Sequence, residues 1–341
     1  MKLLVTGGCG FIGSHFIRMA LTQNKKVHVF NVDLLTYAGR GHNLADLERN
    51  PRYHFVRGDI ASPIIHNLVR RYHPEVIVNF AAESHVDRSV HDAAIFLRTN
   101  TLGTQNLLDA ARTSGVRRFI QISTDEVYGS IPCKKHAKED WPLSPSSPYS
   151  ASKAAADLCV LAAHRTHDQN VVITRCTNNY GPYQFPEKLI PLMITHALHD
   201  LSLPIYGDGQ HRRDWIYVED HCRGILLALK RGKAGEIYNF GMGMEPPNLA
   251  IVREILKLLK KPTRLIHHVK DRPGHDDRYA VDTTKSHREL GWKPQMNFHE
   301  GLATTVEWYR RNTQWWLRLK DAAFQDFYRK NYGSNYPTNS T

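Results

Sequence analysis

Short apolar runs alternate with segments of helical spacing along the first half of the chain. Six runs are rich in Val, Ile and Phe, as strands are: KLLVTG, VHVFNVD, HFVRGDI, EVIVNFAA, RRFIQIST and NVVITRC. Between most of them lie stretches such as IIHNLVRRY and TQNLLDAARTSG, where apolar residues recur three and four apart. Because the runs are apolar on both faces, the pattern predicts an α/β fold with a doubly wound parallel sheet covered by helices.

The pattern changes beyond about Tyr180. There, isolated helices are separated by segments rich in Pro and Gly, such as NYGPYQFPEKL, PIYGDGQHRRDW and DRPGHDDRY. The 341 residues also exceed the roughly 250 to 300 at which a single core stops growing. We therefore predict a large domain of residues 1–180 plus about 215–243, a smaller α/β domain of 181–214 and 244–330, and a polar tail of 331–341.

Composition narrows the cellular setting. No run approaches the roughly 20 apolar residues that span a bilayer, and MKLLVTGGCG enters a strand and a glycine turn without a signal-peptide core. The five cysteines are widely spread and lack C-x-x-C spacing, which argues against disulfides and a zinc ribbon. We expect a cytoplasmic protein with reduced thiols.

The net charge of +12 is scattered rather than gathered into a stripe, so we expect no nucleic-acid partner but a surface that favours anionic small molecules. Twenty histidines invite a metal site, and His164 and His167 lie one helical turn apart. Since neither H-E-x-x-H nor a third ligand accompanies them, we predict no metal.

A glycine turn, TGGCGFIG, joins the first strand to the first helix. Gly7, Gly10 and Gly13 leave the backbone free to approach a pyrophosphate at the helix N-terminus. The next strand ends in Asp33, about 20 residues on, where a carboxylate can bind the adenosine ribose hydroxyls. An acid there favours NAD over NADP, so the turn predicts a Rossmann-type NAD site.

Tyr149 and Lys153 stand four residues apart at the start of an alanine-rich helix, in SSPYSASKAAADLCVL, and project from one face. A neighbouring ammonium and a nicotinamide cation would both favour the phenolate, so Tyr149 is a candidate base. With fifteen tyrosines, about one such pair is expected by chance. Its position after the Rossmann strands makes it significant.

Asp125 and Glu126 follow directly on the apolar strand QIST. A solvated turn is one interpretation, because a buried ionised carboxylate costs several kcal/mol. Neighbouring side chains of a strict strand point to opposite faces. For both carboxylates to reach one substrate, the strand must end here and the backbone must bend.

A resemblance covers nearly the whole chain. In order, TGGCGFIG, NFAAESHVDRS, ISTDEVYG, SPYSASK, NNYGPYQFPEKLIP, PIYGDGQHRRDW and DRPGHDDRYAVD resemble the extended short-chain dehydrogenases, and within them the nucleotide-sugar 4,6-dehydratases. Many relatives share the glycine turn and Y-x-x-x-K, whereas T-D-E after the fifth strand marks dehydratases. The resemblance implies a lyase that uses bound NAD to convert dTDP-glucose to its 4-keto-6-deoxy product, as in deoxysugar and rhamnose biosynthesis.

The resemblance assigns roles to five residues. Tyr149, supported by Lys153, takes the proton of the hydroxyl on sugar carbon 4 while hydride leaves that carbon. Glu126 takes the carbon 5 proton, Asp125 protonates the departing carbon 6 hydroxyl, and Thr124 holds the substrate. An acid and a base side by side need environments that push their pKa values apart.

The binding residues follow from the same resemblance. The cofactor is expected to contact Gly7, Gly10, Phe11, Ile12, Gly13, Asp33, Leu34, Leu35, Thr36, Asp59, Ile60, Phe80, Ala81, Ala82, Ser84, Thr99, Tyr149, Lys153 and Asn179. The sugar nucleotide is expected to contact Ser84, His85, Thr124, Asn178, Lys188, Leu189, Pro204, Ile205, Tyr206, Arg213, Asn248, Asp271, Arg272, Pro273, Gly274 and His275. Within this set, the planar fork of Arg213 suits a diphosphate and the ring of Tyr206 offers a face for a pyrimidine. Arg212 stands where relatives usually have an apolar residue, so either arginine is a candidate for the phosphate.

Apolar faces on the helices predicted at 93–114 and 149–167 leave two interpretations. In relatives such helices form a dimeric four-helix bundle, so a homodimer is expected, and the alternative is packing against the sheet.

Other functions stay open from sequence alone. UDP-glucose is an alternative substrate, since a methyl group is worth only about 1 to 3 kcal/mol and thymidine is favoured on resemblance alone. A sugar-nucleotide epimerase or decarboxylase would keep the glycine turn, Tyr149 and Lys153 but would not need the two carboxylates. A cofactor-binding regulator without catalysis would need one of these residues broken, and all are present.

Overall fold

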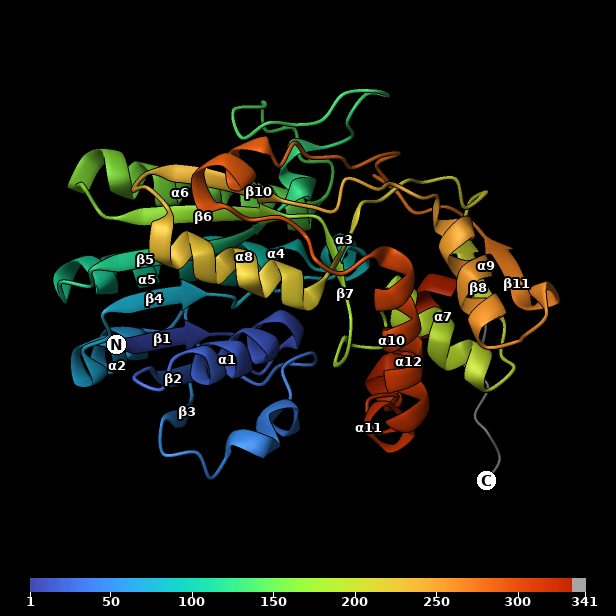
Figure 1. Ribbon diagram of the computed structural model, residues 1–341, viewed down its shortest axis with the longest axis horizontal. Coiled ribbons are helices and arrows are strands. Elements are labelled where there is room, and N and C mark those ends of the chain that lie inside the picture. The colour runs from blue at the N-terminus through green and yellow to red at the C-terminus, as the bar shows by residue number, and fades with distance from the viewer. Residues whose placement is uncertain (333–341) are drawn as a thin grey trace.

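The computed structural model describes residues 1–332, and a seven-stranded sheet forms its larger part (Figure 1). In spatial order the strands are β10 (Glu236–Phe240), β6 (Val171–Cys176), β5 (Arg118–Thr124), β4 (Val76–Asn79), β1 (Lys2–Thr6), β2 (His28–Asp33) and β3 (Tyr53–Arg57). All neighbouring pairs are parallel. The predicted doubly wound fold is therefore confirmed, and its strand order reverses between β1 and β4, where such sheets bind ligands.

Helices cover both faces of this sheet because its strands are apolar on both sides. Along β1, Leu3 and Val5 belong to one hydrophobic cluster and Leu4 to the other, and all three are fully buried. The first cluster lies under α1 (Phe11–Gln23) and α8 (Val218–Arg231); the second lies under α2 (Ile64–Tyr72), α5 (Gly103–Thr113) and α6 (Pro148–His167) (Figure 1).

A second core lies beside the sheet. It is built by α7 (Leu189–Leu198), α9 (Asn248–Leu258), α10 (Phe298–Arg311), α11 (Thr313–Leu317), α12 (Ala322–Tyr332) and the small sheet of β8 (Leu203–Tyr206) with β11 (Ile266–Val269). The strands β7 (Asn178–Tyr180) and β9 (Trp215–Tyr217) form a short parallel pair, and Figure 1 shows β7 between the two regions. The exact domain boundaries stay a prediction. Of the predicted polar tail, Asn331 and Tyr332 belong to α12, and 333–341 lie outside the described residues.

Shorter elements connect these parts. They are η1 (Gly41–Leu47), α3 (Val86–His91), α4 (Ala93–Phe96), the π-helical turns η2 (Leu97–Leu102) and η5 (Ser286–Leu290), and the 3-10 turns η3 (Asp125–Tyr128) and η4 (Thr263–Leu265). The helix predicted at 93–114 is thus α4, η2 and α5 in succession. None of the five cysteines forms a disulfide. Within residues 1–332, no helix is both long and apolar enough to cross a membrane.

Candidate active site

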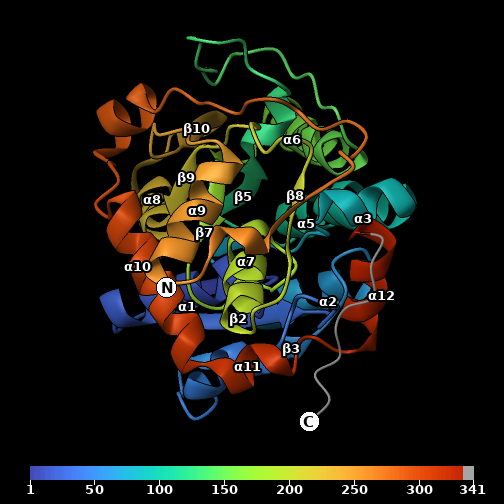
Figure 2. The ribbon, with the colours of Figure 1, turned by 90° about the vertical axis from the view of Figure 1, so that its right-hand side faces the viewer.

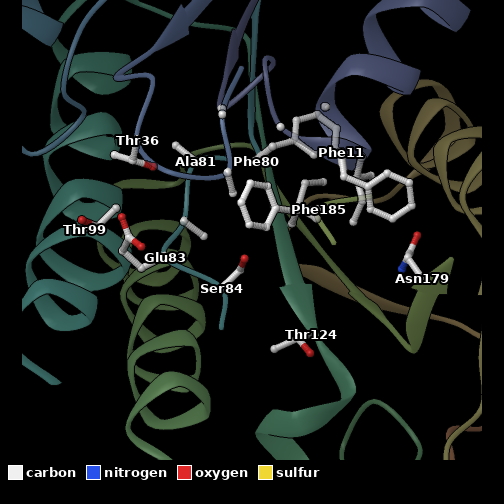
Figure 3. Close-up of a pocket in the computed structure, with 18 of the residues that line it drawn as sticks. Phe11, Thr36, Phe80, Ala81, Glu83, Ser84, Thr99, Thr124, Asn179 and Phe185 are labelled. Carbon is white, nitrogen blue, oxygen red and sulfur yellow. The ribbon is translucent and has the colours of Figure 1, made fainter. Parts of the chain in front are cut away.

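A cavity of about 330 Å³ opens at the carboxyl ends of the central strands, where the strand order reverses. Every residue predicted for the cofactor lines it except Leu35, and so do Ser84, Thr124, Asn178, Lys188 and Leu189 of the substrate set. Figure 3 shows the rings of Phe11, Phe80 and Phe185 around the cavity, with Thr124 at the end of β5. One cavity thus joins the glycine turn to the carboxylates.

The glycine turn offers bare backbone to this cavity. Gly7 has φ +68°, and a Cβ there would lie 2.5 Å from the backbone nitrogen of Ala81. A Cβ on Gly13 would lie 2.5 Å from the carbonyl oxygen of Gly7. The chain therefore needs glycine at both positions, and the helix N-terminus behind them fits a pyrophosphate.

Asp33 ends β2 as predicted and fastens the glycine turn to it. Its two carboxylate oxygens accept hydrogen bonds from the Cys9 nitrogen at 2.9 Å and the Leu35 nitrogen at 2.8 Å. Burial raises the pKa of Asp33, and the two backbone donors oppose that shift. A carboxylate held here fits the ribose hydroxyls of a dinucleotide.

Tyr149 and Lys153 enter the cavity from the first turns of α6. The helix begins with a capping box between Ser147 and Ser150, which fixes where this turn starts. The Lys153 ammonium donates to the Ile122 carbonyl at 2.6 Å. Burial raises the pKa of Tyr149 well above its ordinary value, with the Glu126 carboxylate adding to the shift, and burial lowers the pKa of Lys153.

The phenolate expected from the sequence is therefore not favoured by the side chains alone. The reason is that burial of Tyr149 raises its pKa and the negative charge of Glu126 raises it further, while the Lys153 ammonium donates its hydrogen bond to a backbone carbonyl. A cationic nicotinamide ring beside Tyr149 acts in the opposite direction.

The predicted bend after the fifth strand is confirmed. β5 ends at Thr124, and the 3-10 turn η3 begins at Asp125, so both carboxylates line the cavity instead of pointing to opposite faces. Thr124 Oγ1 donates to Asp125 Oδ1 at 3.3 Å. The buried Asp125 Oδ2 has no hydrogen-bond partner within the described residues.

The surroundings of Asp125 and Glu126 shift the pKa values of the two carboxylates differently. Burial raises the pKa of Asp125 well above its usual range, and the negative charge of Glu126 adds to this effect. Burial also raises the pKa of Glu126, but the nearby cations of Arg272, Lys188 and Arg213 oppose the shift. Asp125 is thus the group favoured to hold a proton and Glu126 the group better placed to lose one.

The three cations belong to segments that are far apart in the sequence. Lys188 Nζ donates to the Ser84 carbonyl at 2.6 Å, and Arg272 pairs with Asp87 at 2.9 Å. Arg213 is 4% exposed, donates to the backbone carbonyls of Arg212 and Asp276, and lies 4.2 Å from the Tyr279 ring. The side chain of Arg212 is exposed. The buried Arg213 is therefore the arginine that faces the carboxylates.

The remaining predicted substrate residues do not line the cavity. Pro204, Ile205 and Tyr206 belong to β8, Asn248 begins α9, and Asp271, Arg272, Pro273, Gly274 and His275 follow β11. Gly274 has φ +64°, and a Cβ there would lie 2.7 Å from the Ser146 carbonyl oxygen. His85 precedes α3. Whether these residues contact substrate stays a prediction.

Sequence reasoning missed several groups here. Asp87 accepts from both Tyr206 and Arg272, and the buried Glu187 pairs with Arg88 at 2.9 Å. His211 joins Asp271 and His275 in a group whose ligand atoms lie within 4.8 Å of one another, where no metal site was predicted. Asp271 is hydrogen-bonded to His275 at 2.7 Å and lies 3.3 Å from His211. Asp87, Glu187 and His211 each lie inside a segment that carried the resemblance, but no residue pattern in those segments predicted these contacts.

Comparisons with known proteins agree with this geometry. A family model, GDP-mannose 4,6 dehydratase, matches residues 4–305. The dTDP-glucose 4,6-dehydratase of Streptomyces niveus is 52% identical over 324 residues, which are 94% of this chain and 96% of the relative. That of Escherichia coli K12 is 46% identical over 358 aligned positions, covering 97% and 99% of the two chains.

Among solved structures, a dehydratase is more similar to this chain than an epimerase is. DesIV, the dTDP-glucose 4,6-dehydratase of Streptomyces venezuelae, was crystallised with NAD and TYD bound; it has a TM-score of 0.91 and 50% identity, covering 94% of this chain and all of that one. The UDP-glucose 4-epimerase of Thermotoga maritima, with UDP-glucose, has a TM-score of 0.86 and 29% identity, covering 92% of this chain and all of that one. The chain is thus more similar to these dehydratases than to this epimerase.

Proposed function

Because the chain belongs to the GDP-mannose 4,6-dehydratase family of nucleotide-sugar enzymes, we propose that it is an NAD-dependent lyase converting dTDP-glucose to dTDP-4-keto-6-deoxyglucose. The observation that carries the proposal is the placing of Asp125 and Glu126 in one cavity with Tyr149. An epimerase needs no such pair of carboxylates. The product is a precursor for deoxysugars, which gives the enzyme its place in deoxysugar biosynthesis.

The cavity fits NAD. The glycine turn would hold the pyrophosphate and Asp33 the adenosine ribose, while Lys153 and Tyr149 lie at the nicotinamide end. Thr177 Oγ1 and Asn178 Oδ1 are buried without a partner within residues 1–332 and line the same cavity, so they offer polar groups to a ligand. Bound NAD supplies the chemistry that side chains lack, since it accepts a hydride from sugar carbon 4 and returns it to carbon 6.

The protein's own residues move the protons. Tyr149 takes the proton of the carbon 4 hydroxyl, which leaves a ketone there. The ketone acidifies carbon 5, whose proton passes to Glu126 while Asp125 protonates the carbon 6 hydroxyl and water departs. Glu126 later returns a proton to carbon 5. The proton that Tyr149 gains balances the one that Asp125 gives up, so the net change is loss of one water.

The raised pKa of Asp125 suits its proposed role as acid. Burial and the negative charge of Glu126 both raise the pKa of Asp125, and this favours the protonated form, which can give a proton to the departing hydroxyl. Glu126, facing Lys188, Arg213 and Arg272, suits the base. We assign the same three cations to the diphosphate and Tyr206 to the pyrimidine.

Nuclear magnetic resonance in heavy water tests the activity. The purified protein is given dTDP-glucose and, separately, UDP-glucose without added reductant. A new carbon 6 methyl signal with deuterium at carbon 5 is expected, faster with dTDP-glucose. Inversion at carbon 4 without a methyl signal would instead indicate an epimerase, and faster turnover of UDP-glucose would reassign the nucleotide.

An apolar surface supports a homodimer through a four-helix bundle. Leu97 and Leu102 on η2 are 48% and 63% exposed, and Leu158 on α6 is 56% exposed. These two elements pack together, with Asn100 donating to Ser152 at 2.9 Å. Exposed leucines on adjoining helices are typical of an interface.

Analytical ultracentrifugation tests the dimer. We expect about twice the 39.1 kDa chain mass for the native protein and a monomer when Leu102→Glu and Leu158→Glu are combined. Leu258→Glu, at a 38% exposed position on α9, is the matched control and should stay dimeric. A dimer that survives the double substitution would refute this interface.

The five free cysteines support a reducing compartment, so we place the protein in the cytoplasm. Cell fractionation tests this placement, and recovery from an oxidising compartment would contradict it.

A further inference from the structure

The π-helical turn η2 and the helix α5 that continues it have two different faces. Figure 2 shows α5 between α6 and α2, and η2 packs against α6. Leu97 and Leu102 of η2 are exposed and belong to the surface that we assign to the dimer. Thr99, between them in the sequence, lines the cofactor cavity (Figure 3). One short element thus reaches from the proposed subunit interface to the cofactor site.

The loop that follows β3 forms the wall of the cavity beside the ribose site. The Gly58 nitrogen donates to the carbonyl oxygen of Asp33 at 3.1 Å, and the next two residues, Asp59 and Ile60, line the cavity. Adenine is attached to the ribose that Asp33 is proposed to hold, so it would lie against Asp59 and Ile60. A carboxylate there can accept a hydrogen bond from the exocyclic amino group of adenine.

Arg98 of η2 fixes the orientation of the Asp59 carboxylate. Arg98 donates to one carboxylate oxygen at 2.6 Å, and the other oxygen accepts from the Ala61 nitrogen at 2.8 Å. The side chain of Arg98 is 50% exposed, so the ion pair itself adds little to stability. Its consequence is geometric, because a carboxylate tied at both oxygens has one orientation in which to meet a ligand.

The rest of this loop is fastened to the same helical segment. A Cβ on Gly103, where α5 begins, would lie 2.7 Å from the Ile60 side chain, so the helix approaches the loop closely. Asn106, one turn later, donates to the carbonyl oxygens of Ile60 and Ser62 at 2.6 and 2.9 Å. A displacement of η2 and α5 would therefore displace the adenine wall.

We propose that Arg98 is a positioning residue for the adenine of the cofactor and that it couples the proposed dimer interface to NAD retention. This inference rests on the proposed function, in which the cavity binds NAD and a second copy covers Leu97 and Leu102. A partner seated on these leucines restricts η2, and the ion pair holds Asp59 to the restricted element. Pairing of two copies and NAD binding then strengthen each other. Because the cationic end is built from other residues, dTDP affinity stays native.

Calorimetry with two dinucleotides tests the role of Arg98. The second is nicotinamide hypoxanthine dinucleotide, in which an oxygen replaces the amino group of adenine. Arg98→Gln is expected to weaken NAD binding about 3- to 10-fold, roughly the value of one hydrogen bond, and to bind the analogue as the native protein does. Arg98→Lys keeps a cation for Asp59 and should bind NAD with native affinity. Arg117→Gln removes one end of a 3.9 Å surface ion pair with Glu75 and is the matched control.

Three results would overturn this role. They are an equal loss for both dinucleotides in Arg98→Gln, native NAD affinity in that variant, and a loss in Arg98→Lys as large as that in Arg98→Gln.

Two measurements test the coupling. In sedimentation, saturating NAD is expected to lower the concentration at which the native dimer dissociates about 10- to 100-fold, because two cofactors bind per dimer, and dTDP alone should not. In the combined Leu102→Glu and Leu158→Glu variant, NAD affinity should fall as in Arg98→Gln, and adding Arg98→Gln should cause no further loss. Leu258→Glu should keep native NAD affinity. Native NAD affinity in the combined variant, additive losses, or a native protein that is monomeric with and without NAD would overturn the coupling.

Failure of the proposed function appears in a different measurement. A native protein that binds NAD but does not turn over dTDP-glucose would refute the proposed function, while the NAD affinities of the variants still decide the inference. A native protein that turns over dTDP-glucose, with equal NAD affinity in every variant, would refute the inference alone.

Discussion

The cofactor end and the cationic end of the candidate site are built in different ways. The cofactor end is formed by one short stretch of backbone, the glycine turn, held by a carboxylate at the end of the neighbouring strand. The cationic end is formed by the side chains of Lys188, which lines the cavity, and of Arg213 and Arg272, which act on Glu126 without lining the cavity; each is fixed by a different partner. The cofactor end depends on backbone that carries no side chains, and the cationic end depends on side chains that come together from positions far apart in the sequence.

This difference separates the expected effects of substitution. A change at the cofactor end should alter NAD binding, because backbone and Asp33 face the dinucleotide there. A change at the cationic end should alter binding of the sugar nucleotide, because Arg213 and Arg272 are among the side chains that we assign to its diphosphate. The carboxylates lie where the two ends meet, and a change there should affect chemistry alone.

The largest effect is expected for Glu126→Gln. Without the base at carbon 5, elimination should fall about 10²- to 10⁴-fold in kcat, while NAD and dTDP-glucose remain bound. Quenched-flow analysis should then show reduced cofactor accumulating without a methyl product. The control is Glu300→Gln, an exposed acid at the start of α10, which should keep native turnover. Native turnover in Glu126→Gln would remove this residue from the mechanism.

Asp214, which follows Arg213, is expected to contribute up to about 3 kcal/mol to the free energy of unfolding, by an amount that depends on pH. Its buried carboxylate accepts hydrogen bonds from the backbone nitrogens of Met242, Gly243 and Met244, and burial still raises its pKa to about 6. The folded state therefore binds a proton that the unfolded state has lost between about pH 4 and 6, so this contribution to the free energy of unfolding declines as pH rises.

Urea denaturation at a series of pH values measures this decline. In Asp214→Asn the free energy of unfolding should vary less with pH across that window than in the native protein. An equal pH dependence in both proteins would show that Asp214 does not titrate there.

The same contrast explains how far sequence reasoning reaches. The strand runs and the glycine turn are local patterns, and each lies where it was predicted, as does the bend after Thr124. The contact of Asp87 with Arg272 joins residues 185 positions apart, and no local pattern encodes such a pairing. The raised pKa of Tyr149 was missed for the same reason, because it depends on burial and on Glu126 from another element.

A smaller effect, about 10- to 100-fold in KM, is expected for Arg213→Gln. This variant loses the buried guanidinium proposed for the diphosphate, and charge-assisted hydrogen bonds contribute about 1.5 to 3 kcal/mol. Arg212→Gln is the matched control, since that side chain is exposed and should leave KM unchanged. NAD affinity, measured by calorimetry, should be native in both variants. The reverse ranking of the two arginines would assign the phosphate to Arg212.

The smallest effect is expected for a substitution at the cofactor end that removes only a charge. Asp33→Asn keeps an oxygen that can accept from the Cys9 or Leu35 nitrogen but removes the negative charge. Because a carboxylate repels the extra phosphate of NADP, its loss should narrow the preference for NAD over NADP by about 10-fold. The affinity for dTDP should not change, because the cationic end is built from other residues. If dTDP affinity fell in parallel with NAD affinity, the two ends would be coupled through the fold, and the separation between backbone-built and side-chain-built ends would not hold.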